Sequence, residues 1–245
     1  MLKSKLDSLI LLIIFIIINC SAIKAQIRLN AQDKSIHYDL IRPSHTLYKA
    51  VFFDTNGKIT RELVIDHTAE VDTLRKEMAF INTVPFAAGK LMVDTSVENF
   101  SGSARYTLAT YPNTKYESIK YSPTSVKAQN IINGVKTNKI TKMPAGYFDD
   151  NSIWDILGII PFKKGISYQL DCYGTDTRTQ VSIPYTIEYL LDEKIQDTAS
   201  GFSNNMVLKV SYDGTIAFVW INKFTHLMTK EFVQGKDYSF TRITI

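Results

Sequence analysis

The chain has 245 residues, with 28 Lys and Arg against 24 Asp and Glu, and with 13 Tyr and 13 Phe. Without residues 1–25, whose pattern is described next, 25 basic and 23 acidic residues remain, and this near balance gives no electrostatic footprint for nucleic acid. Cys172 is then the only cysteine, which excludes an internal disulfide and leaves apolar burial as the source of stability.

Residues 1–25 have the pattern of a secretory signal peptide. Lys3 and Lys5 precede ten consecutive apolar residues, Leu9–Ile18, and small residues follow them. Ten residues span about 15 Å as a helix, half of a bilayer core, so this stretch is too short for a stable membrane span. No transmembrane segment is predicted in the mature chain. The protein is therefore expected to be exported, to the periplasm or the outer membrane.

Two processing sites fit this segment. Cleavage after Ala25 would release a soluble protein that begins at Gln26. Lipidation of Cys20 is the alternative, although Asn19 stands where a small residue normally precedes such a cysteine. Residues 26–245 are expected to form a single β-rich domain.

Strand patterns dominate the first half of this domain. Val51–Phe53 and Lys58–Ile65 flank Asn56-Gly57, which predicts a β-hairpin because both residue types suit a tight turn. More strands are predicted at 91–97, 104–109, 126–132 and 135–142, the last two hinged at Asn133-Gly134.

One short helix is predicted near 149–158. Its polar start, Asp149 to Ser152, resembles a cap, and Gly158 and Pro161 are expected to end it. One apolar stripe would face the core, formed by Ile153, Ile156, Leu157 and Ile160. Segment 143–165 is the only plausible divider between two halves, although one continuous sheet is favoured.

The second half is again strand-like. Met206–Tyr212 and Thr215–Ile221 flank Asp213-Gly214, a strong hairpin signal, and a last strand is predicted at 238–245. The buried face of the first strand is expected to carry Met206, Leu208, Val210 and Tyr212. These spacings predict an all-β, mostly antiparallel fold: a curved open sheet, half-barrel, barrel or sandwich with one short helix.

Two stretches carry a resemblance to known proteins. Tyr147–Trp154 followed by Ile160–Gly165 resembles a pattern in uncharacterised β-rich envelope proteins of Gram-negative bacteria. Trp220–Thr225 is similar to the Trp-Ile-Asp-x-x-Thr turn shared by those proteins and the periplasmic lipoprotein carriers, with Asn222 in place of the aspartate. The resemblance implies an open curved antiparallel sheet with a helix near its concave face, and it implies no reaction.

Signatures of catalysis and of metal binding are missing from the sequence. No histidine pair has ligand spacing, among His37, His45, His67 and His226. Asp66 and His67 are adjacent, so on a strand their side chains would point to opposite faces. Cys172 lies in an alternating segment that predicts a strand position rather than a nucleophile. Serine hydrolase and phosphate-binding motifs are absent too, so no metal, cofactor or catalytic residue is predicted.

The binding hypothesis depends on aromatic side chains. Six of them could line a cleft between the helix and the sheet: Phe148, Trp154, Phe162, Tyr168, Phe218 and Trp220. The alternative is that these rings fill the core.

Three functions follow from these patterns. The first is an exported non-catalytic envelope protein that binds a lipid, an acyl chain or a hydrophobic peptide on a curved sheet. The second is a scaffold or adaptor of an envelope assembly, with a protein partner and no ligand cavity. The third is a hydrolase whose dispersed site would gather two or more of the four histidines with aspartates in one polar pocket.

Overall fold

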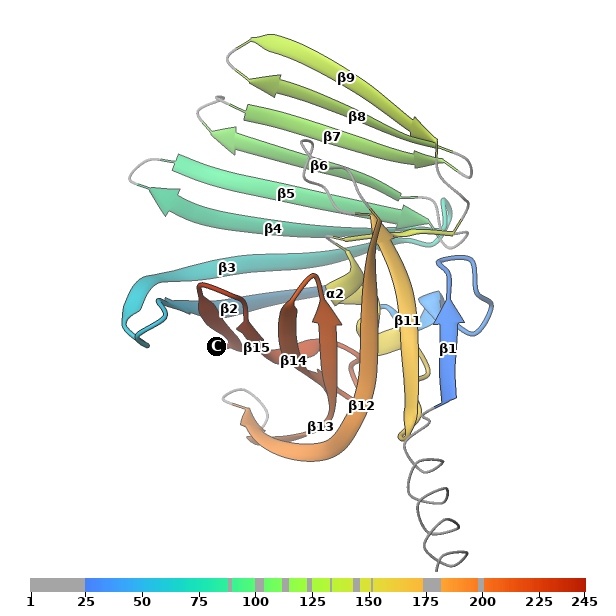
Figure 1. Cartoon of the computed structure of the whole chain (residues 1–245), viewed down its shortest axis with the longest axis vertical. Coiled ribbons are helices and arrows are strands. Elements are labelled where there is room, and N and C mark those ends of the chain that lie inside the picture. The colour runs from blue at the N-terminus through green and yellow to red at the C-terminus, as the bar shows by residue number, and fades with distance from the viewer. Residues whose placement is uncertain are drawn as a thin grey trace, which may run out of the picture.

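A computed structural model of the chain describes residues 25–87, 90–99, 104–111, 115–122, 125–132, 134–142, 146–150, 152–173, 182–197 and 201–245, which are mostly β-strand (Figure 1). Apart from Ala25, the predicted signal peptide with Cys20 lies outside the described residues, and so does Asn133. Within the described part of the chain, no helix is long and apolar enough to span a bilayer.

The strands belong to one 16-stranded sheet. Their bounds are β1 (Ala25–Leu29), β2 (Ser44–Phe53), β3 (Ile59–Asp72), β4 (Glu77–Ala87), β5 (Lys90–Asn99), β6 (Ala104–Tyr111), β7 (Lys115–Ser122), β8 (Ser125–Ile132), β9 (Val135–Lys142), β10 (Phe148–Asp149), β11 (Ile166–Tyr173), β12 (Ser182–Asp197), β13 (Gly201–Tyr212), β14 (Thr215–Asn222), β15 (Met228–Gln234) and β16 (Ser239–Thr244). The described residues also form three short helical segments, η1 (Tyr38–Leu40), α2 (Ile153–Ile156) and η2 (Leu157–Ile159).

The order of strands across the sheet is β1-β11-β12-β13-β14-β15-β16-β2-β3-β4-β5-β6-β7-β8-β9, and β10 pairs with β11 outside this path. Both β1 and β10 run parallel to β11, whereas the other neighbours are antiparallel. Strand β16 pairs with β2, from Ser239 opposite Phe53 to Thr244 opposite Tyr48. Hydrogen bonds therefore join the strands after segment 143–165 to those before it.

The sheet is curved and open, and its two edges are β1 and β9. In Figure 1 the β2–β9 array forms the upper part, β11–β15 curl below it, and α2 lies inside the curl. Ile153, Ile156 and Leu157 are fully buried there and belong to the same core as Leu208 and Val219. The core thus lies between the short helix and the concave face (Figure 1).

Both predicted hairpin turns are confirmed. Asp213 and Gly214 have φ angles of 41° and 72°, the left-handed pair that a two-residue hairpin needs, and Tyr212 pairs with Thr215. Gly57 has a φ of 76°, and its N–H donates to the carbonyl of Asp54 between β2 and β3. Strands also form in all the segments predicted for β5, β6, β8, β9 and β16.

The helix differs from the prediction in length and in its ends. Phe148 and Asp149 form β10, and Ser152 makes no side-chain hydrogen bond that caps the helix. Only Ile153–Ile156 is α-helical, and η2 continues the segment to Ile159. The predicted apolar stripe is confirmed, since all four of its residues are buried. Gly158 does not end the helix. It lies against the backbone of His226, where a Cβ would overlap the carbonyl group.

Candidate functional site

The six predicted aromatic residues do not gather in one cleft. Phe148, Phe162 and Tyr168 are buried in the core, with the rings of Phe162 and Tyr168 edge-to-face at 5.0 Å between centroids. Trp154 on α2 packs edge-on against Tyr185 and Tyr212, at 6.0 and 5.7 Å. Three of these four residues therefore fill the core, the alternative that the sequence offered, and Trp154 is partly buried against it. Their role in ligand binding stays a prediction.

Phe218 and Trp220 lie on the other face of the sheet. They alternate along β14 with Ala217, Val219 and Ile221, which are buried in the core inside the curl. The Trp220 indole N–H donates to Glu193 at 2.7 Å on the outer side. A cleft between helix and sheet cannot include these two rings.

A polar row crosses the concave face instead. His67 on β3 lies opposite Asn82 on β4, and Asn82 lies opposite Asp94 on β5. The Asn82 amide nitrogen donates to Asp94 at 2.9 Å, so its oxygen faces His67 and accepts from Nδ1–H, also at 2.9 Å. We call His67, Asn82 and Asp94 the polar row.

The polar row is tied to the helix inside the curl. His67 Nε2 lies 3.4 Å from a carboxylate oxygen of Asp155 on α2, and the His67 side chain is only 5% exposed. Asp66, the neighbour of His67 in sequence, points to the outer face and pairs with His45 at 2.8 Å. The prediction that Asp66 and His67 face opposite sides is therefore confirmed.

A buried ion pair lies near the row on the same concave side. The Arg242 guanidinium donates to Glu231 at 2.8 and 3.0 Å, and the Glu231 side chain is only 2% exposed. Arg242 also lies over the Tyr48 ring, 5.1 Å from its centroid, and the Tyr48 ring is 5.9 Å from that of His67. The Tyr48 hydroxyl donates to the Met228 carbonyl at 3.0 Å.

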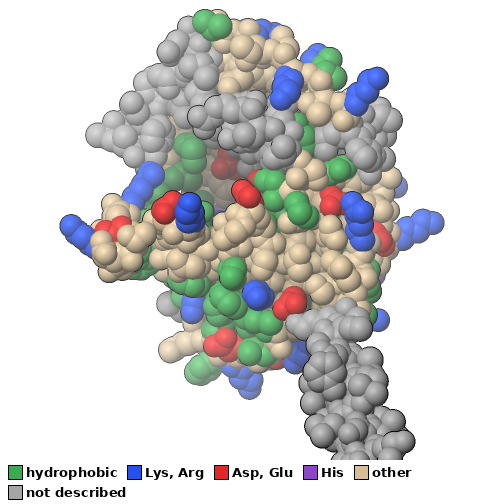
Figure 2. Space-filling model, in the orientation of Figure 1, with side chains coloured by type: hydrophobic (Ala, Val, Ile, Leu, Met, Phe, Trp, Pro, Cys, Tyr) green, Lys and Arg blue, Asp and Glu red, His purple; other side chains and the backbone are tan. Residues whose placement is uncertain are grey.

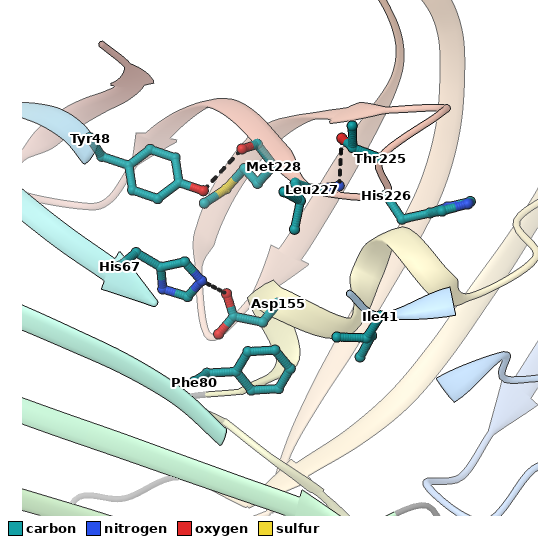
Figure 3. Close-up of a pocket in the computed structure, with 9 residues that line it drawn as sticks. All are labelled: Ile41, Tyr48, His67, Phe80, Asp155, Thr225, His226, Leu227 and Met228. Atoms are coloured by element: carbon teal, nitrogen blue, oxygen red, sulfur yellow. Dashed lines mark hydrogen bonds and ion pairs between the residues drawn. The ribbon is translucent and has the colours of Figure 1, made fainter. Parts of the chain in front are cut away.

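A small, partly open cavity lies between His67 of the polar row and the helix (Figure 3). Its volume is about 10 Å³, room for about one water molecule. Its lining comes from β2, β3, β4, α2, the segment between η1 and β2, and the turn before β15 with the first residue of β15: Ile41, Tyr48, His67, Phe80, Asp155, Thr225, His226, Leu227 and Met228. Polar and apolar groups from distant parts of the chain therefore meet here.

The four histidines are distributed unequally around this cavity. His67 and His226 both line it, but the His226 ring points away from Asp155 in Figure 3, and its Nδ1 lies 2.9 Å from the Gly158 carbonyl oxygen. His45 is exposed on the outer face. His37 donates its backbone N–H to Ile159 beside η2. Only the His67 ring and one aspartate meet within the cavity. Among the described residues, no group of three His, Cys, Asp or Glu side chains could hold a metal ion.

Burial raises the pKa values of the carboxyl groups at this site. The pKa of Asp94 rises to about 6, although the hydrogen bond from Asn82 opposes the shift. Burial also raises the pKa of Asp155, against the opposing effects of His67 and Arg242. Elsewhere in the curl, burial raises the pKa of Asp150 to about 6, opposed by a hydrogen bond from Tyr185. Perturbed carboxyl groups of this kind are typical of functional sites.

Asp94→Asn is expected to stabilise the protein at about pH 7.5 by about 1–2 kcal/mol, because it removes a buried charge and keeps an oxygen acceptor for Asn82. The folded-state pKa lies above the unfolded one, so the native state binds the extra proton. The Asp94 contribution is therefore most favourable below about pH 4 and is lost as pH rises through about 6. Thermal unfolding followed by circular dichroism should show a variant advantage that grows over this range. An equal advantage at pH 4 and pH 7.5 would contradict the assignment.

The polar row was missed in the sequence because its members are far apart along the chain. One signal could have located part of it: the turn between β3 and β4, where Asp72 pairs with Glu77. Counting outward from that turn in an antiparallel pair places His67 opposite Asn82. Asp155 and the Arg242–Glu231 pair have no comparable local signal.

These features define an open, curled, mostly antiparallel β-sheet protein with a buried polar row on its concave face. Its fold is similar to the crystal structure of a β-barrel-like protein of the domain of unknown function DUF1849 from Brucella abortus. The two share 11% sequence identity with a TM-score of 0.59, over 83% of this chain and 95% of that one. At this identity the likeness shows the fold alone. No family model and no curated protein matches the sequence.

Proposed function

We propose that this is an exported, non-catalytic envelope protein that binds an apolar ligand on the concave face of its curved sheet. The ligand would be a lipid, an acyl chain or a hydrophobic peptide. The signal-peptide pattern supports export, and the resemblance of Trp220–Thr225 to the turn of lipoprotein carriers agrees with an envelope role.

The polar row is the observation that carries this proposal. Buried carboxyl groups with raised pKa values, such as Asp94 and Asp155, lower the stability of the folded protein at neutral pH. Residues that lower stability in this way are expected at functional sites. The row lies on a concave face, where ligand sites are usually found, with a few polar groups among apolar ones. A polar head group could hydrogen-bond to Asn82 or Asp94, which His67 and Asp155 hold in place from behind.

Apolar residues lie beside the row in the position that a chain would need. Ile65, Val84 and Met92 stand two residues from His67, Asn82 and Asp94 on the same strands, and therefore on the same face. Val84 lies directly opposite Met92. We call Ile65, Val84 and Met92 the apolar row.

The ligand would lie over the open concave surface rather than in the small cavity, which has room for only about one water molecule. Figure 2 shows a hollow between the β2–β9 array and the lower part of the molecule, with hydrophobic and acidic side chains inside it. An acyl chain over the apolar row, with its head on the polar row, would use this concave surface.

The test is solvent extraction of the purified mature protein followed by mass spectrometry. Wild type is expected to release lipid in near-stoichiometric amount, and Asn82→Trp to release little, because the indole would fill the concave face. Thr83→Trp is the matched control, one residue further along β4 on the outer face. Absence of lipid from wild type, or equal lipid in both variants, would refute the proposal. The intact mass of the same sample distinguishes cleavage after Ala25 from lipidation of Cys20.

A hydrolase with a dispersed site is the second candidate, because His67, His226 and Asp155 border one cavity. His67 would be its general base. In the structure Asn82 and Asp155 occupy both ring nitrogens of His67, which leaves no free nitrogen for a substrate proton. Non-catalytic binding needs no free nitrogen on the His67 ring, and we therefore prefer it as the function. Esterase activity abolished by His67→Gln and retained by His45→Gln would reverse this preference.

A further inference from the structure

A fixed turn displays an exposed aromatic ring between β14 and β15. The Asn222 side-chain oxygen accepts hydrogen bonds from the backbone N–H groups of Phe224 and Thr225, at 2.8 and 3.1 Å. Two backbone bonds, Asn222 N–H to Leu227 and His226 N–H to Asn222, close the turn at 2.9 Å each. Phe224 is nevertheless 92% exposed. Because the backbone of this turn is already fixed, a partner that covers the ring has to order only the Phe224 side chain.

A second exposed ring lies close by. The backbone N–H of Lys223 donates to the carbonyl of Asn204 at 2.9 Å, and Phe202 stands two residues before Asn204 on β13, 73% exposed. Lys194 on β12 lies opposite Asn204. An open groove of about 460 Å³ lies among these segments, lined by Asp192, Glu193, Lys194, Asn204 and Lys223. We call Phe202, Phe224, Lys194 and Lys223 the hairpin-end patch.

The charge around this patch is positive. Asp192 accepts hydrogen bonds from both Lys164 and Lys223 at 2.8 Å, and these bonds hold its pKa well below the usual range. Glu193 accepts from the Trp220 indole, and Lys230 lies over that ring at 4.6 Å. Four lysines therefore surround two carboxylates that are already engaged.

We propose that the hairpin-end patch docks the protein onto the surface of an anionic lipid bilayer. The two phenylalanine rings would enter the interface between head groups and acyl chains, and the lysines would remain at the level of the phosphates. Charge complementarity selects an anionic membrane over a neutral one, because each lysine near such a surface adds to binding. The patch is separate from the polar and apolar rows, so docking does not depend on the proposed ligand.

The experiment is flotation of the full mature chain with phosphatidylcholine vesicles that contain about 30% phosphatidylglycerol, at about 0.1 M salt. Phe224→Ser is expected to lower the partition coefficient about tenfold, and Lys194→Gln a few-fold. Leu74→Ser is the matched control, since Leu74 is 95% exposed in the turn between β3 and β4. Its binding should equal that of wild type, and pure phosphatidylcholine vesicles should bind much less protein.

Three outcomes would overturn the proposal. The first is no binding of wild type to anionic vesicles, and the second is equal binding of wild type and Phe224→Ser. The third is a dimer in sedimentation equilibrium that Phe224→Ser dissociates, which would assign the patch to a second copy of the chain. Circular dichroism spectra that match wild type would exclude misfolding as the cause of a loss.

Discussion

Arg242→Met is expected to lower the free energy of unfolding by about 3–5 kcal/mol at neutral pH, because it leaves the Glu231 carboxylate buried without its cation. Burial already raises the pKa of Glu231, and the Arg242 charge opposes that shift. Without Arg242 the carboxyl group should take up a proton more readily. The loss of stability should therefore shrink as pH falls. Urea unfolding followed by circular dichroism at several pH values measures this loss.

Two controls separate the buried charge from the lost contacts of the arginine. The double variant Arg242→Met, Glu231→Leu should recover much of the loss, because no charge then remains without a partner. Lys49→Met should change stability by less than about 0.5 kcal/mol, since Lys49 and Glu62 pair at 3.1 Å with both side chains 47% exposed. A double variant no more stable than the single one would contradict the charge argument.

Gly158→Ala is expected to cost about 3 kcal/mol or more, or to prevent folding. A Cβ on Gly158 would overlap the His226 carbonyl oxygen and lie 2.7 Å from its carbonyl carbon. The backbone of η2 and the turn before β15 would have to separate, and both border the cavity beside the polar row. Thermal unfolding and soluble yield measure the effect.

Gly57→Ala is the control for this substitution. Gly57 has a φ of 76° but nothing within 4 Å of a new Cβ, so alanine there should cost only about 1 kcal/mol for its backbone conformation. The contrast separates a steric clash from the general effect of replacing glycine. If both variants melted at the same temperature, the close approach of η2 to His226 would not limit stability.

The hairpins were predictable because their signals are local. The Asp213-Gly214 and Asn56-Gly57 turns depend on residues that tolerate positive φ, and alternation in the flanking strands then fixes which residues face the core. The opposite orientation of Asp66 and His67 followed from the same period of two.

The length of the helix was overestimated because sequence periodicity carries no information about competing tertiary contacts. Asp149, which the sequence placed at the start of the helix, instead forms β10 with Phe148 and pairs with Tyr173 of β11. Gly158 appeared to be a stop signal, yet it is required for the close packing of η2 against His226. Tertiary contacts of this kind leave no periodic trace in the sequence.

The polar row could not be predicted as a site, since it depends on register across three strands and on a helix from another part of the chain. The sequence singled out His67 only as one of four histidines. Asp155 reaches His67 because β10 and β11 place α2 inside the curl. The aromatic prediction left out the alternation of side chains along β14. That alternation buries Ala217, Val219 and Ile221 and places Phe218 and Trp220 on the outer face.

The most direct test of ligand binding on the concave face is proton–nitrogen NMR of the histidine side chains during titration of lipid-stripped protein with a lysophospholipid. The His67 ring and the Asn82 side-chain amide are expected to shift and saturate together. His45, on the outer face of the same pair of strands, should not move. Binding that shifts His45 but leaves His67 and Asn82 unchanged, or a titration without any saturable shift, would contradict the account.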